Sequence, residues 1–135
     1  MNANWALQKG IYETLSQNPQ VTGLLGGPYI HDGAPRATRF PYMTFGQTVD
    51  YDWSTGSEDG REHTLTLHIW SRANGRKEVI EIIEAVNAAL ADASIALPGH
   101  ALVNLQFQFA EARRDPDGET LHGIIRFRAV TEPLN

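Results

Sequence analysis

The sequence predicts an α+β fold: a largely antiparallel or mixed β-sheet with two main helices packed on one face and a C-terminal β-hairpin. Three observations lead to this fold class. Segments with helical and strand periodicity follow one another in the order helix, strands, helix, strands. The stronger helical segment is apolar along one side only. Two strand-like segments near the C-terminus flank a turn sequence.

The two helices are predicted from apolar residues that recur with helical spacing. The first stripe consists of Leu7, Ile11 and Leu15. Pro19 ends that segment, because a residue that precedes proline avoids helical geometry. Residues 21–41 are rich in glycine and proline and are expected to be irregular, with a short strand at 29–31. The second helix, residues 77–93, carries the stripe Val79, Ile82, Ile83, Val86 and Leu90.

Two strands are predicted between the helices, at residues 42–53 and 61–72. In the first strand, the apolar residues Met43, Phe45, Val49 and Tyr51 all have odd numbers, so a regular strand would place them on one face. In the second strand, Leu65, Leu67 and Ile69 point one way and Thr64, Thr66, His68 and Trp70 the other. The polar stretch between the strands, residues 54–60, is expected to form a loop that is mobile in the free protein.

The last two strands are expected to form a hairpin around a cluster of charged residues at positions 112–123. A three-residue loop, Pro116, Asp117 and Gly118, aligns the apolar residues of both strands on one face. The resulting pairs are Phe109 with Ile125, Phe107 with Phe127, and Leu105 with Ala129. On the opposite face, this register places Gln106 across from Arg128 and Gln108 across from Arg126. The acidic residues of the cluster are therefore interpreted as turn residues.

Composition limits the function classes that are open to this chain. Its 135 residues show no repeat or boundary, so we expect a single domain over residues 1–135. The formal charge of −5 argues against a general phosphate-binding surface. There are no cysteines, no basic and apolar leader, and no stretch long enough to span a membrane. These features predict a protein that is made in the cytoplasm and does not associate with membranes.

The sequence contains no constellation of residues that predicts catalysis. His63 and His68 differ in parity on one strand, so they point to opposite faces and do not share a metal ion. The acidic pairs Asp50/Asp52 and Glu58/Asp59 lie at or near the polar loop, where solvated turn residues are expected. Phosphate-binding, dinucleotide-binding and nucleophile-elbow motifs are absent. We therefore expect no catalytic residues, no metal site and no cofactor.

Several segments, in their order and spacing, resemble the tail terminator (tail completion) proteins of long-tailed phages, prophages and gene transfer agents. They are FPYMTFG, DWST, EHTLTLHIWSRANGRKE, LPGHALVNLQF and RRDPDGETLHGIIRFRAVTEP. The resemblance extends over residues 7–133 and implies a structural virion protein, not an enzyme. It implies a hexameric ring that caps the head-proximal end of the tail tube, stops tube polymerisation and joins the tail to the neck or head. The implied partners are the tail tube protein and a neck or head-completion protein.

The resemblance also implies that DNA passes through the lumen of the ring without specific binding. Assembly would take place in the bacterial cytoplasm, and the protein would then remain in the tail of the particle. Two alternatives stay open at this point. One is a different neck or head-completion protein of a phage-like particle. The other is a small hydrolase or ligand-binding module that uses His68, His122 and nearby acidic residues.

Parity and loop position select a set of residues for contact with other subunits. They lie on the polar faces of the predicted strands or in the polar loop and its flanks, where an arginine- and tryptophan-bearing surface resembles a subunit interface. The candidate assembly-interface residues are Trp53, Glu58, Asp59, Arg61, His68, Trp70, Gln106, Gln108, Arg126 and Arg128.

Overall fold

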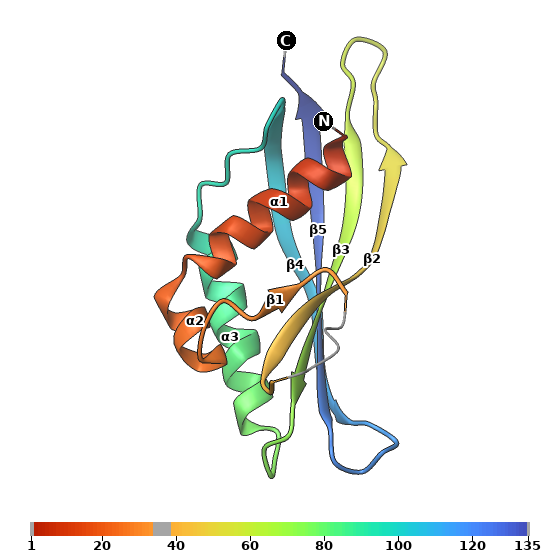
Figure 1. Cartoon of the computed structure of the whole chain (residues 1–135). Coiled ribbons are helices and arrows are strands. Elements are labelled where there is room, and N and C mark those ends of the chain that lie inside the picture. Colours follow the sequence, from red (N-terminus) through yellow and green to blue (C-terminus); the bar gives the residue numbers. More distant parts are fainter. Residues whose placement is uncertain (1, 34–38, 135) are drawn as a thin grey trace.

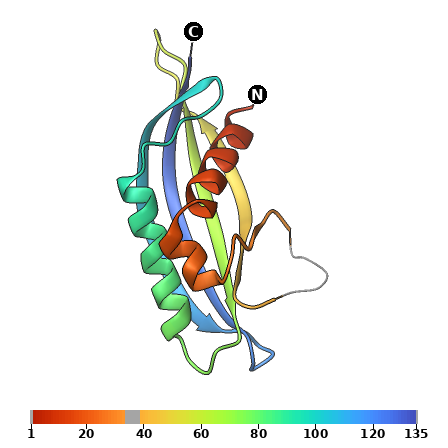
Figure 2. The same ribbon diagram turned by 60° about the vertical axis from the view of Figure 1, so that its left-hand side comes forward.

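The computed structural model describes residues 2–33 and 39–134 of the chain. Within these residues, a five-stranded sheet carries three helices on one of its faces (Figures 1 and 2). The elements in chain order are α1 (Ala3–Ser16), α2 (Pro19–Leu25), β1 (Ile30–His31), β2 (Tyr42–Asp52), β3 (Arg61–Ser71), α3 (Lys77–Asp92), β4 (His100–Arg114) and β5 (Leu121–Pro133). The α+β class predicted from the sequence is confirmed.

The sheet has the strand order β1-β2-β3-β5-β4. β1 runs parallel to β2, and the other neighbouring pairs are antiparallel. The predicted mixed sheet and C-terminal hairpin are both present. The short strand expected at residues 29–31 is β1. Of the stretch expected to be irregular, residues 34–38 lie outside the described part of the chain.

Helix α2 shows that the expectation of irregular structure directly after Pro19 was wrong. Pro19 lies in the first turn of this helix, where its missing N–H removes no intrahelical hydrogen bond. The side-chain oxygen of Asn18 accepts hydrogen bonds from the backbone N–H groups of Gln20 (3.1 Å) and Val21 (3.0 Å). Gly26 ends the helix with a φ of +83°. The proline therefore ends one helix and begins the next, which adds a third helix to the expected two.

Helix α3 packs closely against the middle of the sheet. Its residues Val79, Ile82 and Val86 are fully buried, as the periodicity predicts. A Cβ atom at Gly123 of β5 would lie 2.6 Å from Cγ1 of Val79, so only glycine permits this approach. The hydrophobic core lies between the helices and this face of the sheet, which we call the helix face. It includes Leu7, Ile11, Leu15, Met43, Leu65, Leu67, Ile69, Ile125, Phe127 and Ala129.

Strand β2 contains a β-bulge that changes which of its side chains reach the core. The register against β3 shifts by one residue between Phe45 and Thr48. Met43 and Phe45 are buried on the helix face, whereas Tyr51 pairs with Glu62 on the opposite face and is 55% exposed. The shared parity of these apolar residues in the sequence therefore does not survive in the fold, because one extra residue reverses the alternation.

Two register shifts in β4, between Leu102 and Asn104 and between Phe107 and Phe109, change the predicted register of the C-terminal hairpin. Leu105 pairs with Ala129 and Phe107 with Phe127, as predicted. Beyond Phe107 the register shifts by one residue, so that Phe109 pairs with Arg126 rather than with Ile125. The predicted pair of Gln106 with Arg128 is present. The predicted pair of Gln108 with Arg126 is wrong, because Gln108 occupies the bulge.

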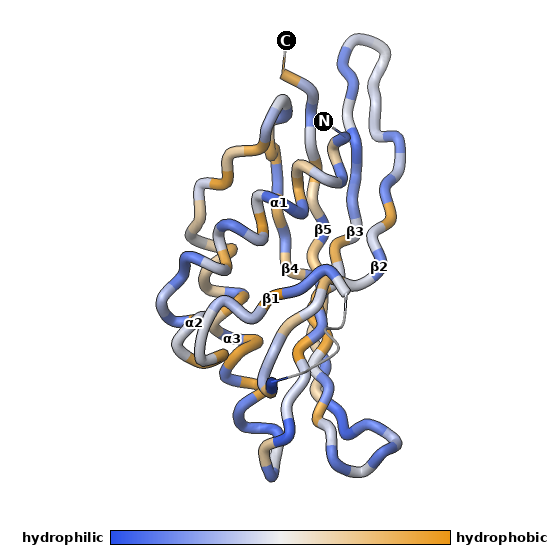
Figure 3. The backbone as a smooth tube through the Cα atoms, in the orientation of Figure 1, coloured by the Kyte–Doolittle hydropathy of each residue, from blue (hydrophilic) through white to orange (hydrophobic). Residues whose placement is uncertain are grey.

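The turn between β4 and β5 explains the charged cluster of the sequence. Asp115 donates its backbone N–H to the carbonyl of Thr120 (2.8 Å), so the loop spans residues 116–119 and is one residue longer than predicted. The Asp117 carboxylate accepts hydrogen bonds from the backbone N–H and hydroxyl of Thr120 and from the N–H of Glu119. These bonds lower the pKa of Asp117 to about 2. Figure 3 shows this loop as hydrophilic, and its acidic residues serve the turn.

Among the described residues, no helix is long and apolar enough to cross a membrane.

Candidate functional site

The face of the sheet that points away from the three helices forms the candidate functional site, and we call it the open face. In β3 and β5, the residues of even number point to it, because the odd residues are buried against the helices. The open face carries Thr44, Tyr51, Glu62, Thr64, Thr66, His68, Trp70, Gln106, Phe109, His122, Arg126 and Arg128. No helix covers it in the described chain (Figures 1 and 2).

Arg128 and Arg126 are held in place on the open face by neighbouring side chains. Nε and Nη2 of Arg128 donate to Oε2 of Glu62 at 2.9 and 2.6 Å. The Arg128 guanidinium also lies 5.6 Å from the ring centroid of Trp53. The Arg126 guanidinium lies 5.1 Å from the ring centroid of Phe109. The fold thus brings three of the predicted interface residues into one aromatic and basic surface.

The loop between β2 and β3 extends beyond the end of the sheet (Figure 1). At its base, Trp53 donates its backbone N–H to the carbonyl of Gly60 (2.9 Å), and Thr55 donates to Glu58 (2.8 Å). Residues 54–59 are exposed, including the predicted interface residues Glu58 and Asp59. The loop therefore presents two carboxylates and an exposed tryptophan at one end of the open face.

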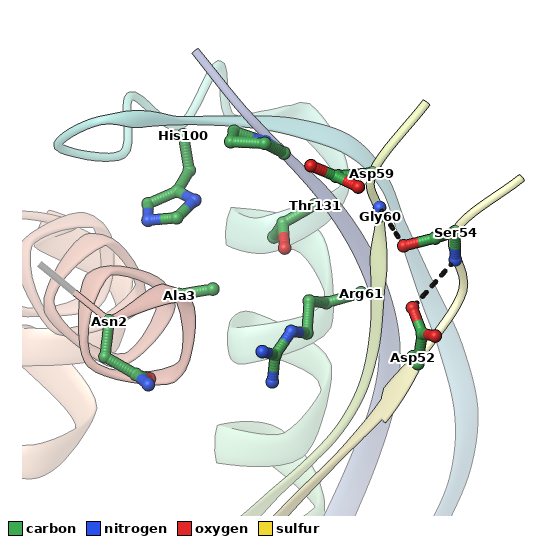
Figure 4. A pocket seen from close by; sticks show the side chains of 10 residues that line it. Asn2, Ala3, Asp52, Ser54, Asp59, Gly60, Arg61, His100 and Thr131 are labelled. Atoms are coloured by element: carbon green, nitrogen blue, oxygen red, sulfur yellow. Dashed lines mark hydrogen bonds between the residues drawn. The ribbon is translucent and has the colours of Figure 1, made fainter. Parts of the chain in front are cut away.

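A pocket of about 380 Å³ lies beside this loop, between the start of α1 and the ends of β3, β4 and β5 (Figure 4). Arg61, which was predicted as an interface residue, lines this pocket on the helix face and pairs with Asp50. The other lining residues are Asn2, Ala3, Asp52, Ser54, Asp59, Gly60, His100, Thr131 and Pro133. Charges of both signs line the pocket, and Arg61 lies on the opposite side of the sheet from Arg128.

His63 connects α1 to the sheet close to this pocket. Its side chain is buried, with Nδ1 at 2.6 Å from Oδ1 of Asn4 and Nε2 at 2.9 Å from the hydroxyl of Thr131. Since the amide oxygen only accepts hydrogen bonds, Nδ1 carries the proton and Nε2 accepts from the threonine. Burial lowers the pKa of His63, against the opposing effect of Asp50.

A cluster of two histidines lies on the open face, at the end away from the β2–β3 loop. Nδ1 of His68 is 2.7 Å from Nε2 of His122, and the His122 ring stacks on Trp70 with centroids 4.0 Å apart. Oδ1 of Asp115 lies 3.5 Å from Nδ1 of His122. Burial is the main cause of a lowered pKa in both histidines. The pairing of β3 with β5 places His122 opposite Trp70, a contact that the sequence alone did not predict.

Comparison with known proteins decides the family. A family model described as tail completion protein gp17 matches residues 9–132, which is nearly the whole chain. The chain belongs to this family of tail completion proteins. The resemblance found in the sequence is therefore confirmed, and this tail completion protein is a structural component of a phage or phage-like tail, not an enzyme.

Individual relatives agree with the family assignment. The tail completion protein gp17 of Bacillus phage SPP1 is 27% identical over 126 residues, which cover 93% of this chain and 92% of that protein. A chain in the virion of a native gene transfer agent particle superposes with a TM-score of 0.87 at 27% identity, covering 96% of both chains. The solved structure of SPP1 gp17 shares the fold with a TM-score of 0.63 at 24% identity, covering 98% of this chain and 91% of that one.

The histidine cluster does not support the alternative of a hydrolase. The fold does bring His68, His122 and an acidic residue together, as that alternative required. However, the His122 side chain is only 7% exposed, and its ring is packed against Trp70. Within residues 2–33 and 39–134, no three histidine or carboxylate side chains are grouped so as to hold a metal ion. We interpret the cluster as packing on the open face.

We expect the protein to lose stability as the pH falls from 8 to 5.5. Burial lowers the pKa of His63, His68 and His122 in the folded chain, so the folded state binds fewer protons than the unfolded state. The stability that the neutral rings provide is complete above the unfolded pKa of about 6.5 and is lost below it. Urea unfolding at both pH values measures this loss. His63→Gln should reduce the difference, and an unchanged difference would contradict the assignment to His63.

Proposed function

We propose that this protein is a tail terminator that forms a hexameric ring on the head-proximal end of the tail tube. The ring stops tube polymerisation and provides the surface to which the neck or head-completion protein binds. The observation that carries this proposal is the match of nearly the whole fold to a chain of a gene transfer agent virion. A conduit for DNA should not hold phosphate, and the net charge of −5 supports passage without specific binding.

The open face and the β2–β3 loop are the proposed contact regions. Apart from the histidine cluster, the open face carries arginines fixed beside aromatic rings, and such residues are enriched at protein interfaces. The β2–β3 loop projects from the same end as the Trp53–Arg128 contact. The candidate residue Gln106 lies opposite Arg128 in the sheet, and Gln108 lies at the neighbouring bulge of β4. Assembly takes place in the bacterial cytoplasm, after which the protein stays in the tail.

A tube-capping assay tests the proposal directly. Purified protein is added to polymerising tail tube protein, and tube lengths and tube ends are measured by electron microscopy. We expect density at one end of each tube and a tube length that shortens as more protein is added. Binding along the tube wall, or binding to head particles but not to tubes, would contradict termination. The second outcome would instead identify a neck or head-completion protein.

Hydrogen exchange of the β2–β3 loop provides a second test. Residues 54–59 are exposed, so we expect fast amide exchange in the free protein, apart from amides such as Thr55 that donate within the loop. On capped tubes or in particles, exchange of the Gly56, Ser57 and Asp59 amides should slow by about tenfold or more, which corresponds to roughly 1.4 kcal/mol. The amides of α3 provide the control. Equal protection in the free and assembled states would exclude this loop from the contact.

A further inference from the structure

The outer edge of β4 has the properties of a strand that another chain covers. β4 spans His100–Arg114 at one end of the sheet order, so one side of its backbone has no strand partner within the described chain. Residues 101–110 read ALVNLQFQFA and contain no charged residue, glycine or proline. Val103 is 53% exposed and Phe107 is 43% exposed. Edge strands that stay in water usually carry charges or proline, and a long apolar edge favours pairing with another strand.

The opposite end of the sheet offers a second free edge. β1 pairs with β2 only at Met43 and Thr44. From Gly46 to Asp52, the side of β2 that faces away from β3 has no strand partner among the described residues. Both free edges belong to the same sheet, and they differ in sequence and in position. A contact between them is therefore heterologous, and a heterologous contact repeated by rotation closes into a ring.

The registers show that the two free edges are at the same level along the strands. One row across the sheet consists of Tyr51, Glu62, Val130 and Asn104. The uncovered part of β2 is thus level with the uncharged part of β4. A second row consists of Thr44, His68, Ile124 and Glu111. The part of β2 that β1 covers is therefore level with the charged end of β4, where Arg113 and Arg114 follow.

Strand direction also fits a contact between two copies. β2, β3, β5 and β4 alternate in direction, so β2 and β4 run antiparallel to each other across the sheet. Rotation about an axis roughly along the strands keeps the direction of every strand. The β2 edge of a rotated copy would therefore meet β4 as an antiparallel neighbour, which continues the alternation.

We propose that residues 104–107 of β4, which follow a register shift at Val103, pair with residues 48–51 of β2 in the next copy of this chain, so that one sheet continues from subunit to subunit. This inference rests on the ring of the proposed function and specifies how its subunits join. Both edges lack a strand partner in the described part of the isolated chain, and each gains one in the ring. Because the contact consists mainly of backbone hydrogen bonds, it tolerates sequence change at most positions as long as the β4 edge stays uncharged.

Cysteine cross-linking tests the contact cleanly, because the chain has no cysteine of its own. The double variant Tyr51→Cys/Asn104→Cys places two thiols on the open face at level positions of the two edges. Facing residues of antiparallel strands are close enough for a disulfide. On oxidation of assembled tails or of the isolated ring, we expect a ladder of covalent oligomers on a non-reducing gel. Val49→Cys/Asn104→Cys tests the neighbouring register on the same face.

Single variants and a misplaced pair provide the controls for cross-linking. Tyr51→Cys or Asn104→Cys alone can give dimers at most, and Ile80→Cys/Asn104→Cys, with one thiol on α3, should give no ladder. Absence of a ladder from both β2–β4 pairs, in a ring of confirmed native mass with reactive thiols, would overturn the edge contact and leave the ring proposal standing. Failure to form any ring or to cap tubes with the wild-type chain would instead count against the proposed function.

A charge on the β4 edge tests the same contact without cysteines. Val103→Lys places a charge on an exposed position of the free edge, so the folded monomer should keep its melting temperature. Incorporation into rings or tails should fall by about tenfold or more. Ile80→Lys is the matched control, because Ile80 is also apolar and is 44% exposed on α3. Normal assembly of Val103→Lys would contradict the proposal, as would equal loss in the two variants.

Discussion

Replacing Phe127 by alanine is expected to lower the free energy of unfolding by about 3–5 kcal/mol. Phe127 is only 2% exposed and lies on the helix face of β5. Its ring makes an edge-to-face contact with Phe107, with centroids 6.1 Å apart. Removing the ring deletes buried apolar area and leaves a cavity between the sheet and the helices, and both effects destabilise the fold. Urea unfolding at pH 7.5, where the lowered pKa values keep His63, His68 and His122 mostly neutral, measures the change.

Phe109→Ala is the matched control for that substitution, because both residues are phenylalanines in the same hairpin. Phe109 is 37% exposed on the open face, and its main defined contact is the Arg126 guanidinium. Loss of an exposed cation–π contact costs about 1 kcal/mol or less. An equally large effect of both substitutions would place Phe109 in the core. It would then support the register without a bulge that the sequence alone predicts.

Hydrophobic periodicity was sufficient to predict most of the fold. The stripes of α1 and α3 and the alternation in β3 are buried as expected, because burial of apolar side chains is what sets these patterns. Helix α2 was missed because Pro19 was interpreted as a stop signal. Asn18 followed by Pro19 is also a helix start, with a side-chain cap and a proline in the first turn. The same two residues support both interpretations, and only the packing of α2 on α3 decides between them.

The three register shifts, one in β2 and two in β4, show where periodicity fails. A bulge inserts one residue and reverses the alternation beyond it, so the register cannot be extended through it from the sequence. In β2, Gly46 lies in the bulge, and a Cβ atom there would come within 2.5 Å of the His68 ring. Such a glycine inside a strand is a usable signal. In β4, Val103 and Gln108 lie at the two register shifts, and nothing in their side chains marks these positions.

The candidate site could be predicted in part from the sequence. Alternation along the strands placed His68 and Trp70 on the polar face of their strand and Arg128 on the polar face of the hairpin, and the pairing of β3 with β5 brings these faces together. Arg61 has an odd number like the buried residues of β3, so the alternation places it on the helix face. It was nevertheless predicted as an interface residue, because it flanks the polar loop. The contact of Trp53 with Arg128 joins the end of β2 to β5, and no local pattern predicts such a long-range pair. Subunit contacts leave no periodic signal, since a solvated sheet face and an interface face have similar residues.

Trp53→Ala is expected to weaken binding to the tail tube or neck partner by about thirtyfold or more, which corresponds to roughly 2 kcal/mol at a binding hot spot. The side chain is 51% exposed at the end of the open face, beside the projecting loop. Arg128, the cation beside its ring, is fixed by two hydrogen bonds to Glu62, so a partner would meet a rigid surface. The free energy of unfolding should change by only about 1 kcal/mol. Co-sedimentation with capped and uncapped tubes measures the binding.

Trp5→Ala is the matched control, because Trp5 is 52% exposed but lies on α1, on the other side of the sheet. A specific loss with Trp53→Ala would place the partner on the open face and the β2–β3 loop. Arg128→Lys should then lose part of the affinity, because lysine keeps the charge but not the planar group that lies against the tryptophan. Equal weakening by Trp5→Ala would move the contact to the helix layer. In that case the open face would be available for contacts other than the one with this partner.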